Sequence, residues 1–233
     1  MRLSVILPAY NEERTIGAVL DAISGVSFGG LPAPVELEVI VVDDASEDRT
    51  AAIVAGYPGI ALLRHDRNRG KGAAIRTGLA RVTGDVVIIQ DADMEYSVND
   101  YPELLRPFLD EEVQVVYGSR FLKRKYPRNM HWMNWLANHL LTLAANLLYR
   151  ARITDEATCF KLFRASLLKS LPLRAKGFEF CPEVTALVRT RNIPIREVPV
   201  EYAARTRAEG KKVRWTDGVR AMKTLVVNRV RRR

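Results

Sequence analysis

The N-terminal half of the chain alternates short apolar runs with stretches of helical periodicity. The apolar runs are rich in Val and Ile and cover residues 3–7, 37–42, 60–63, 86–89 and 113–116. Runs that are apolar at every position are typical of strands buried on both faces, as in a parallel sheet covered by helices. Between them, helical patterns cover residues 13–23, 49–55, 73–81 and 101–109. This alternation predicts a doubly wound α/β fold with a mostly parallel sheet.

The pattern changes after Arg120. Residues 121–233 are mainly helical in pattern, with one further strand expected within 195–202. No Gly/Ser-rich linker separates the two parts, so we predict two halves, 1–120 and 121–233, packed together as one domain. The chain has 233 residues, 48% of them hydrophobic. That composition excludes a disordered protein, and that length is enough to bury a large core.

Acidic side chains follow two of the predicted strands, at the sheet edge where α/β folds bind ligands. Asp91 and Asp93 come just after the strand at 86–89, and Glu95 follows two positions later. Alternate residues of an extended chain share a face, so these carboxylates can point at one ion. Such oxygen ligands favour Mg²⁺ or Mn²⁺, which would neutralise a departing diphosphate. The alternative for a bare Asp-x-Asp triplet is a helix cap or a turn.

Asp43 and Asp44 follow the strand at 37–42. Adjacent carboxylates repel each other unless a cation or a hydrogen-bond donor offsets the repulsion, and the base or ribose edge of a nucleotide is such a donor. The structural alternative is that Ser46 acts as the N-cap of a helix beginning near residue 47.

A glycine-rich turn, Asn-Arg-Gly-Lys-Gly at 68–72, precedes the predicted helix at 73–81. Glycine-permitted backbone amides at a helix N-terminus can meet an anion. The spacing is not that of a Walker loop. A plain turn is the alternative.

Positive charge is concentrated at the C-terminal end. The net charge is +9, and residues 201–233 hold 11 Lys and Arg against 3 Asp and Glu. A nucleic-acid binder would spread its bases more widely, so we expect no nucleic acid as partner; a local basic segment suits phosphate groups or anionic lipid. The bases that can hold a phosphate are Arg120, Arg205, Arg207, Lys211 and Lys212. The alternative for 205–212 is an exposed loop.

Five segments in this order and spacing resemble family-two glycosyltransferases of the GT-A fold. They are VILPAYNEE, VVDDAS, NRGKGAAIRTGL, GDVVIIQDADMEY and YGSRF, and they span the N-terminal half. The resemblance implies that the nucleotide is held by Pro8, Tyr10, Glu12, Asp43 and Asp44, with Lys71 near it. It also implies that Asp91 and Asp93 are the family's Asp-x-Asp motif, which contacts the sugar-nucleotide and its metal.

The C-terminal half resembles the polyprenyl-phosphate branch of that family, which includes dolichyl-phosphate mannose and glucose synthases. The stretches concerned are TDEATCFK at 154–161, GFEF at 177–180, VPV at 198–200 and RTRAEGKK at 205–212. We therefore expect an inverting, metal-dependent transferase that moves a hexose from a UDP- or GDP-sugar to a polyprenyl phosphate. Asp91, Asp93, Arg120 and Asp155 are its expected catalytic residues.

The acceptor decides whether a general base is needed. A hydroxyl acceptor must lose its proton, for which Asp155 and Glu156 are candidates. A phosphate monoester has its second pKa near about 6, so its attacking oxygen is already ionised at neutral pH. A transferase with a hydroxyl acceptor, or a catalytically silent nucleotide-sugar sensor, are the rival interpretations.

Residues 131–149 predict a helix of unusual composition. His131, Asn134, Asn138, Thr142 and Asn146 form one uncharged polar stripe among Trp and Leu residues, and basic residues flank the helix at both ends. The helix is too polar to span a bilayer. It either lies in the membrane interface or packs into the second half. The first apolar run is too short for a signal-peptide core, so we expect a cytoplasmic protein with peripheral contact to the inner face of the cell membrane.

Overall fold

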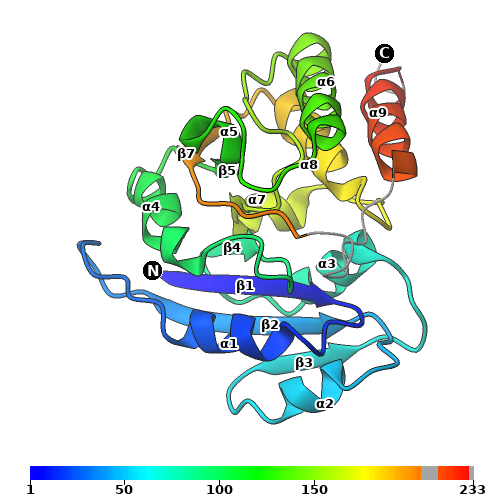
Figure 1. The fold of residues 1–233 in the computed structure, drawn as a ribbon. Coiled ribbons are helices and arrows are strands. Elements are labelled where there is room, and N and C mark those ends of the chain that lie inside the picture. The colour runs from blue at the N-terminus through cyan, green and yellow to red at the C-terminus, as the bar shows by residue number, and fades with distance from the viewer. Residues whose placement is uncertain (206–214, 231–233) are drawn as a thin grey trace.

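The computed structural model describes residues 1–205 and 215–230, and its centre is a seven-stranded sheet flanked by helices (Figure 1). The strands lie in the order β3-β2-β1-β4-β6-β5-β7. Their bounds are β1 (Arg2–Ala9), β2 (Glu36–Asp43), β3 (Ala61–Arg64), β4 (Val86–Ile89), β5 (Val115–Ser119), β6 (Lys161–Arg164) and β7 (Arg196–Pro199). All five strands predicted in the N-terminal half are present, and the expected strand within 195–202 is β7.

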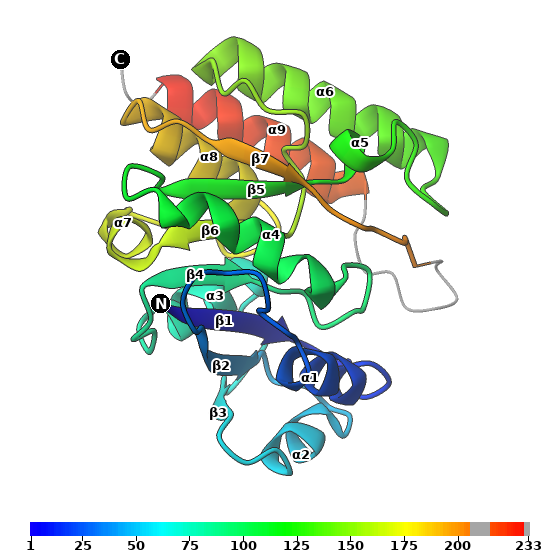
Figure 2. The same ribbon diagram turned by 90° about the vertical axis from the view of Figure 1, so that its left-hand side faces the viewer.

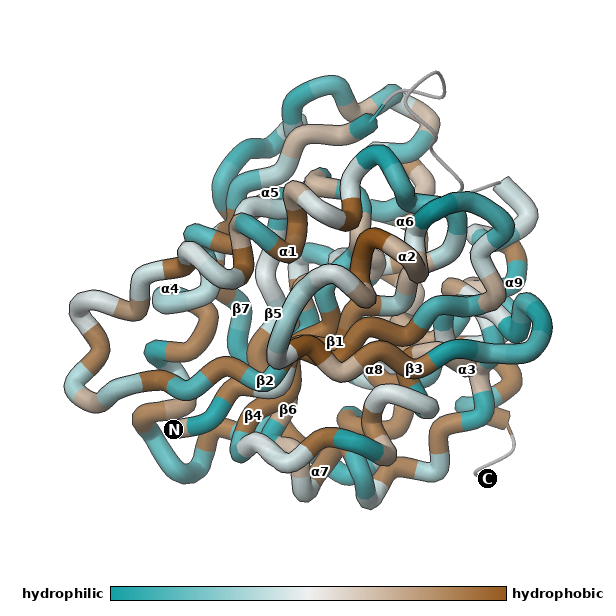
Figure 3. Tube along the Cα trace, turned by 90° about the horizontal axis from the view of Figure 1, so that it is seen from below, coloured by the Kyte–Doolittle hydropathy of each residue, from teal (hydrophilic) through white to brown (hydrophobic). Residues whose placement is uncertain are grey.

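The apolar runs form strands because both of their faces are covered. β1 lies between β2 and β4, and it is parallel to both. Val5 pairs with Val39 on one side and with Ile88 on the other, and both Val5 and Ile88 are fully buried. Figure 3 shows hydrophobic residues along these central strands and hydrophilic ones along the outer loops. The prediction of a mostly parallel, doubly covered sheet is confirmed.

The four helices predicted in the N-terminal half are present with shifted ends. They correspond to α1, α2, α3 and the segment from α4 to η2. The α-helices of the described ranges are α1 (Ile16–Ser24), α2 (Thr50–Ala55), α3 (Lys71–Leu79), α4 (Tyr101–Leu105), α5 (Arg120–Lys123), α6 (Trp132–Tyr149), α7 (Ala165–Ser170), α8 (Phe180–Thr190) and α9 (Trp215–Val230), with 3₁₀ turns η1 (Val98–Asp100) and η2 (Arg106–Leu109). The predicted helix at 101–109 divides into α4 and η2, where Pro107 lacks the N–H that an α-helix needs. Within the described ranges, no helix is long and apolar enough to cross a bilayer.

The C-terminal half contributes strands to the same sheet, which the sequence predicts only for β7. β6 lies between β4 and β5 and is antiparallel to both. Its sequence, Lys-Leu-Phe-Arg, is short and charged at both ends, so it lacks the pattern of a buried strand. Lys161 is nevertheless fully buried, with its ammonium 3.5 Å from the centre of the Tyr117 ring. Both halves therefore share one sheet, and the boundary at residue 120 stays a prediction.

The turn before α3 depends on a glycine. Gly70 has a φ of +91°, and a Cβ at this position would collide with the carbonyl oxygen of Lys176. Two residues on, a Cβ at Gly72 would lie 2.7 Å from the carbonyl oxygen of Ala175. The two glycines let the segment at 175–177 lie directly against the turn.

We expect Gly70→Ala to lower the free energy of unfolding by about 3 kcal/mol, because it combines an unfavourable φ with a backbone collision. Gly59→Ala is the matched control, since Gly59 has a φ of +82° but no atom within 4 Å of the added Cβ. The control should cost only about 1 kcal/mol. Urea unfolding measures both, and equal losses would contradict the role given to the Lys176 contact.

Candidate active site

Three neighbouring strands, β2, β1 and β4, end side by side at one edge of the sheet. The turn after each contains a non-glycine residue with positive φ: Asn11, Ala45 and Met94. The Thr15 hydroxyl donates to the carbonyl oxygen of Ala92 at 2.6 Å, which ties the turn after β1 to the turn after β4. Acidic residues predicted from separate motifs are thereby brought to one place.

The carboxylates of this edge are paired with two bases. Lys71 forms an ion pair with Asp91. The Arg205 guanidinium lies 3.0 Å from Asp93 and 3.1 Å from Glu12, although Glu12 precedes it by 193 residues. All five side chains are largely buried. The structure therefore joins five of the predicted site residues in one cluster, called here the acidic cluster: Glu12, Lys71, Asp91, Asp93 and Arg205.

Electrostatics at this cluster favour an added cation. Burial, together with the charges of Asp91 and Glu95, raises the pKa of Asp93 to about 7, although Arg205 opposes the shift. Burial lowers the pKa of Lys71, but the attraction of Asp91 outweighs it, so the net shift is upward. The cluster holds the three carboxylates of Glu12, Asp91 and Asp93 against two bases, so its charge is negative when all five groups are ionised. The donors are oxygens, which suit Mg²⁺ or Mn²⁺.

Glu95, the predicted third metal ligand, is engaged elsewhere. Its carboxylate accepts hydrogen bonds from the Tyr202 hydroxyl at 2.8 Å and from the Arg205 backbone N–H at 2.7 Å. It thereby fastens residues 202–205 across the sheet edge. In the part of the chain that the structure describes, no three His, Cys, Asp or Glu residues are already grouped to hold an ion. The ligand set Asp91, Asp93 and Glu95 stays a prediction.

Asp43 and Asp44 obtain partners within the protein. Asp43 is fully buried; one oxygen accepts from the Ser46 N–H at 3.0 Å, and Arg64 Nε lies 3.0 Å from the other, without hydrogen-bond geometry. Asp44 accepts from the backbone N–H groups of Arg69 at 2.8 Å and Gly70 at 2.7 Å. The amides of the glycine turn thus bind Asp44 in this structure. These groups offset the repulsion between the two carboxylates, a role that the sequence suggests for the base or ribose edge of a nucleotide.

Two local details differ from the sequence analysis. Ser46 is not a helix N-cap, because α2 begins at Thr50 and the Ser46 hydroxyl accepts from the Asn11 N–H at 2.9 Å. His65, to which the sequence assigns no role, lies 2.6 Å from Asp44 through Nδ1 and 2.9 Å from the Thr77 hydroxyl through Nε2. No sequence signal marks His65, since its partners lie 21 and 12 residues away.

The remaining predicted nucleotide-binding residues lie at the end of β1. Pro8 is in β1 opposite Val42, and Tyr10 follows the strand, half-buried. The predicted phosphate-binding residues Arg207 and Lys211, with Lys212, lie outside the described residues.

Arg120 follows β5 and is held by Asp155. The guanidinium donates to both carboxylate oxygens, at 2.7 and 2.6 Å, and both side chains are buried. Its Nη2 also lies 3.3 Å from the Asn138 side-chain oxygen, and its Cζ lies 5.0 Å from the centre of the Tyr202 ring. Asp155 therefore orients Arg120, and Tyr202 connects Arg120 to the acidic cluster through Glu95.

Glu156, the other candidate base, is fully buried, and neither of its carboxylate oxygens has a hydrogen-bond partner in the described part of the chain. Burial raises its pKa to about 7, and Lys161 and the Thr185 hydroxyl offset part of the shift. The folded protein therefore holds this proton more tightly than the unfolded chain does. The resulting stability is fully present below pH 4.5 and is lost as the pH rises through about 7.

We expect Glu156→Gln, which resembles the protonated form, to remove this contribution. Between pH 5 and pH 8 the unfolding free energy of the parent should fall more than that of the variant, by roughly 2–3 kcal/mol. Urea unfolding at the two pH values measures the difference, and the contribution of Asp93 cancels because both proteins contain it. Parallel pH profiles would contradict the assignment.

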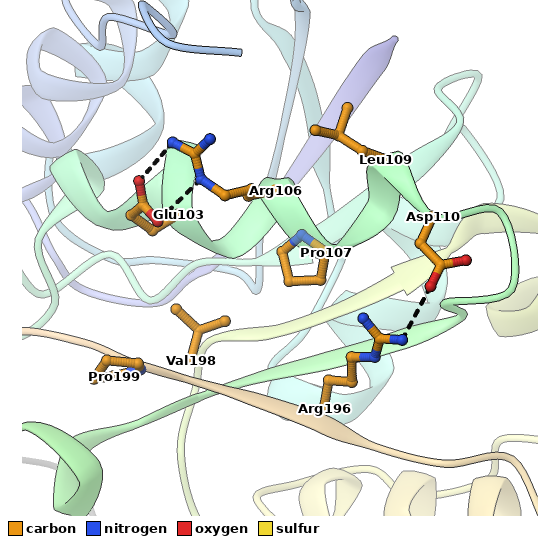
Figure 4. A pocket seen from close by; sticks show the side chains of 8 residues that line it. All are labelled: Glu103, Arg106, Pro107, Leu109, Asp110, Arg196, Val198 and Pro199. Carbon is orange, nitrogen blue, oxygen red and sulfur yellow. Dashed lines mark hydrogen bonds and ion pairs between the residues drawn. The ribbon is translucent and has the colours of Figure 1, made fainter. Parts of the chain in front are cut away.

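A surface hollow of about 540 Å³ lies elsewhere, between the α4–η2 segment and β7 (Figure 4). Its charged side chains pair among themselves, Arg106 with Glu103 at 2.9 Å and Arg196 with Asp110 at 3.0 Å. Its lining includes none of the predicted site residues. We therefore place the site at the acidic cluster and not in this hollow.

Comparison with known proteins agrees with the geometry. A model described as glycosyl transferase family 2 matches residues 4–171, which is more than half of the chain. The chain belongs to glycosyl transferase family 2. The match covers β1 to β6, including the acidic residues at the ends of β1, β2 and β4.

Curated relatives of this family-2 glycosyltransferase include enzymes named for dolichyl phosphate. The UDP-N-acetylglucosamine–dolichyl-phosphate N-acetylglucosaminyltransferase of Methanococcus voltae is 28% identical, over 90% of this chain and 89% of the relative. The dolichol-phosphate mannosyltransferase of Pyrococcus furiosus is 26% identical, over 91% of this chain and 59% of the relative. The chain thus spans most of the first relative and little more than half of the second.

Solved structures give the same fold. Glucosyl-3-phosphoglycerate synthase from Mycobacterium tuberculosis, crystallised with Mn²⁺, UDP and phosphoglyceric acid, matches with a TM-score of 0.72 and 25% identity. The match covers 98% of this chain and 78% of that one. The family-2 glycosyltransferase has the GT-A fold that the sequence predicts.

Proposed function

We propose that the chain transfers a hexose from a nucleoside-diphosphate sugar to a polyprenyl phosphate, with inversion at the anomeric carbon. The observation that carries this proposal is the acidic cluster, in which Asp91, Asp93 and Glu12 meet two bases at the ends of adjacent strands. A diphosphate leaving group needs cations to neutralise its charge, and this cluster combines two bases with carboxylates that can hold a metal ion.

A divalent cation, Mg²⁺ or Mn²⁺, fits these residues. Asp91 and Asp93 would hold it, because their oxygens are hard ligands, and because burial together with the charges of Asp91 and Glu95 raises the pKa of Asp93 to about 7. When bound, the ion supplies charge neutralisation for the departing diphosphate. Arg205, which pairs with Asp93 and Glu12 in this structure, would then be available to donate to phosphate oxygens. The Mn²⁺ and UDP in the crystallised glucosyl-3-phosphoglycerate synthase support this choice.

The nucleoside belongs at the ends of β1 and β2. Pro8, Tyr10, Asp43 and Asp44 lie there, where neighbouring parallel strands end and where α/β folds bind ligands.

The acceptor is proposed to be a phosphate and not a hydroxyl. Asp155 is fully buried and accepts two hydrogen bonds from the Arg120 guanidinium, and Glu156 is fully buried as well, so neither is placed to take a proton from a hydroxyl. A phosphate monoester needs no base, since it is already ionised near pH 7. Arg120, oriented by Asp155, is the cation proposed to bind it. The names of the dolichyl-phosphate relatives support the polyprenyl chain. With such an acceptor, we propose that the enzyme works peripherally at the membrane, on the inner, cytoplasmic face of the cell membrane.

A transfer assay tests this function. UDP- and GDP-hexoses are each incubated with the protein, Mn²⁺ and a prenyl phosphate short enough to dissolve in water. We expect a product whose sugar is released by mild acid, as a phosphate-linked sugar is. An acid-stable glycoside, or no product with any donor, would refute the proposal.

A further inference from the structure

Helix α6 is oriented with its polar side inward. The Asn138 side-chain oxygen lies 3.3 Å from Arg120 Nη2, and the Thr142 hydroxyl accepts from the Glu156 N–H at 3.0 Å. Asn146 both donates to and accepts from the backbone of Ile153, at 2.8 and 3.0 Å. Asn138, Thr142 and Asn146 of the predicted polar stripe therefore pack against the protein, whereas His131 and Asn134, near the start of the helix, are exposed. Much of the apolar side of the helix faces outward.

The outer side of α6 is continued by α9. Ten of the fourteen exposed large hydrophobic residues in the described part of the chain lie on these two helices. They are Trp132, Met133, Leu136, Leu140, Leu143 and Leu147 on α6, and Trp215, Val219, Val226 and Val230 on α9. Leu147 is 73% exposed and Trp215 is 82% exposed. A monomeric protein in water rarely exposes so concentrated an apolar surface.

The two helices form one surface, called here the α6–α9 face. They lie side by side in both ribbon views (Figures 1 and 2), and the Tyr149 hydroxyl of α6 donates to the Leu225 carbonyl of α9 at 2.6 Å. Both helices begin on the side of the molecule where β5 ends and α5 starts (Figure 2). Arg120 is the first residue of α5, so the face borders the proposed acceptor site.

The charged residues around this face are mostly basic. Helix α6 contains no charged residue. Exposed bases stand at its two ends, namely Arg124, Lys125 and Arg128 before it and Arg150 and Arg152 after it, and α9 adds Arg220, Lys223 and Arg229. The acidic residue of α9, Asp217, lies 3.6 Å from Arg220. An apolar surface with a basic rim complements a layer of anionic lipid, where tryptophans and bases lie at headgroup level.

We propose that the α6–α9 face lies on the surface of an anionic bilayer, with both helices parallel to it. The inference rests on the proposed function in one respect, since a polyprenyl phosphate would reach Arg120 from that bilayer. It also explains why the polar side of α6 is inside, where it hydrogen-bonds the segment that holds Arg120.

Vesicle sedimentation tests the proposal. We expect the protein to sediment with vesicles of phosphatidylcholine and phosphatidylglycerol, and to bind at least tenfold more weakly to phosphatidylcholine alone. The double variant Leu143→Gln, Leu147→Gln should bind anionic vesicles at least tenfold more weakly than the parent. Leu109→Gln is the matched control, because Leu109 is 46% exposed but lies next to the hollow of Figure 4; its binding should not change.

The proposal is overturned if the parent does not bind anionic vesicles, or if the double variant binds them as tightly as the parent does. It is also overturned if the parent does not bind vesicles but forms a dimer in ultracentrifugation that the double variant abolishes. Transfer to the water-soluble prenyl phosphate separates this proposal from the proposed function. The double variant should keep that transfer at the parental rate. If the parent itself transfers nothing, the proposed function fails whatever the vesicles show.

Discussion

Replacing Asp93 by asparagine should lower the transfer rate by about a hundredfold to a thousandfold, because in the proposed function it removes a charged metal ligand where the diphosphate departs. The fold should persist. The carboxylate is buried, and its pKa is raised to about 7, so the neutral amide resembles a state that the folded protein already favours. Arg205 also keeps its second partner, Glu12. Steady-state transfer with Mn²⁺ measures the loss, and urea unfolding checks the stability.

Asp85→Asn is the control for this variant. Asp85 precedes β4, whereas Asp93 follows it, so the same substitution is made at the opposite end of one strand. The control should transfer at the parental rate. A fully active Asp93→Asn enzyme would refute the assignment of Asp93 to the metal and diphosphate. If Asp93→Asn does not fold, its lack of activity says nothing about the site. Asp91→Asn is then used instead, and the measurement is the thermal stabilisation by UDP that depends on Mn²⁺. This variant should lose that stabilisation.

Breaking the buried pair of Arg120 and Asp155 should have the largest effect on stability. We expect Asp155→Asn to lower the free energy of unfolding by about 3–5 kcal/mol, because a buried guanidinium loses its counter-charge. Burial lowers the pKa of Arg120, but the attraction of Asp155 outweighs it and the net shift is upward, so Arg120 stays charged. Urea unfolding at pH 7 measures the loss.

An exposed pair of the same type gives the comparison. Arg196 and Asp110 lie 3.0 Å apart, and both side chains are about half exposed. Asp110→Asn should cost less than about 1 kcal/mol, since water already solvates both charges. The double variant Arg120→Met, Asp155→Leu should regain much of the loss of Asp155→Asn, because it leaves no unpaired charge in the interior. Equal losses at the two aspartates would mean that Asp155 does not balance a buried charge.

The sequence predicts those parts of the site that follow from strand order. Asp91 and Asp93 come after a strand with four apolar positions, and the rule that parallel strands end at one edge brings them to the turn after β1. The partners of these residues are not predictable in the same way. Arg205 reaches Asp93 across 112 residues, and Tyr202 reaches Glu95 across 107. No local pattern encodes contacts between segments so far apart.

Helix α6 shows a second limit. Its period is evident from the sequence, but its orientation is not, because an amphipathic helix is usually expected to turn its apolar side inward. Here the interior offers Arg120 and the backbone N–H of Glu156, which need hydrogen-bond partners, and Asn138 and Thr142 supply them. The sequence does not predict β6 for a similar reason. Its first residue, Lys161, is charged and so is expected at the surface, but it is buried because it donates to the Glu156 carbonyl at 2.8 Å.

Arg205 and Lys71 act as resident counter-ions of the acidic cluster. Two bases therefore already offset most of the negative charge of its three carboxylates, and a divalent cation at this site would compete with Arg205 and Lys71 for the same oxygens. We expect the affinity for Mn²⁺ to reflect the difference between these two pairings, and so to be smaller than the carboxylates alone would give. The Arg205 backbone N–H donates to Glu95, so a guanidinium displaced from Asp93 would stay close to the cluster. It could pair with Asp93 again once the ion and the nucleotide had left.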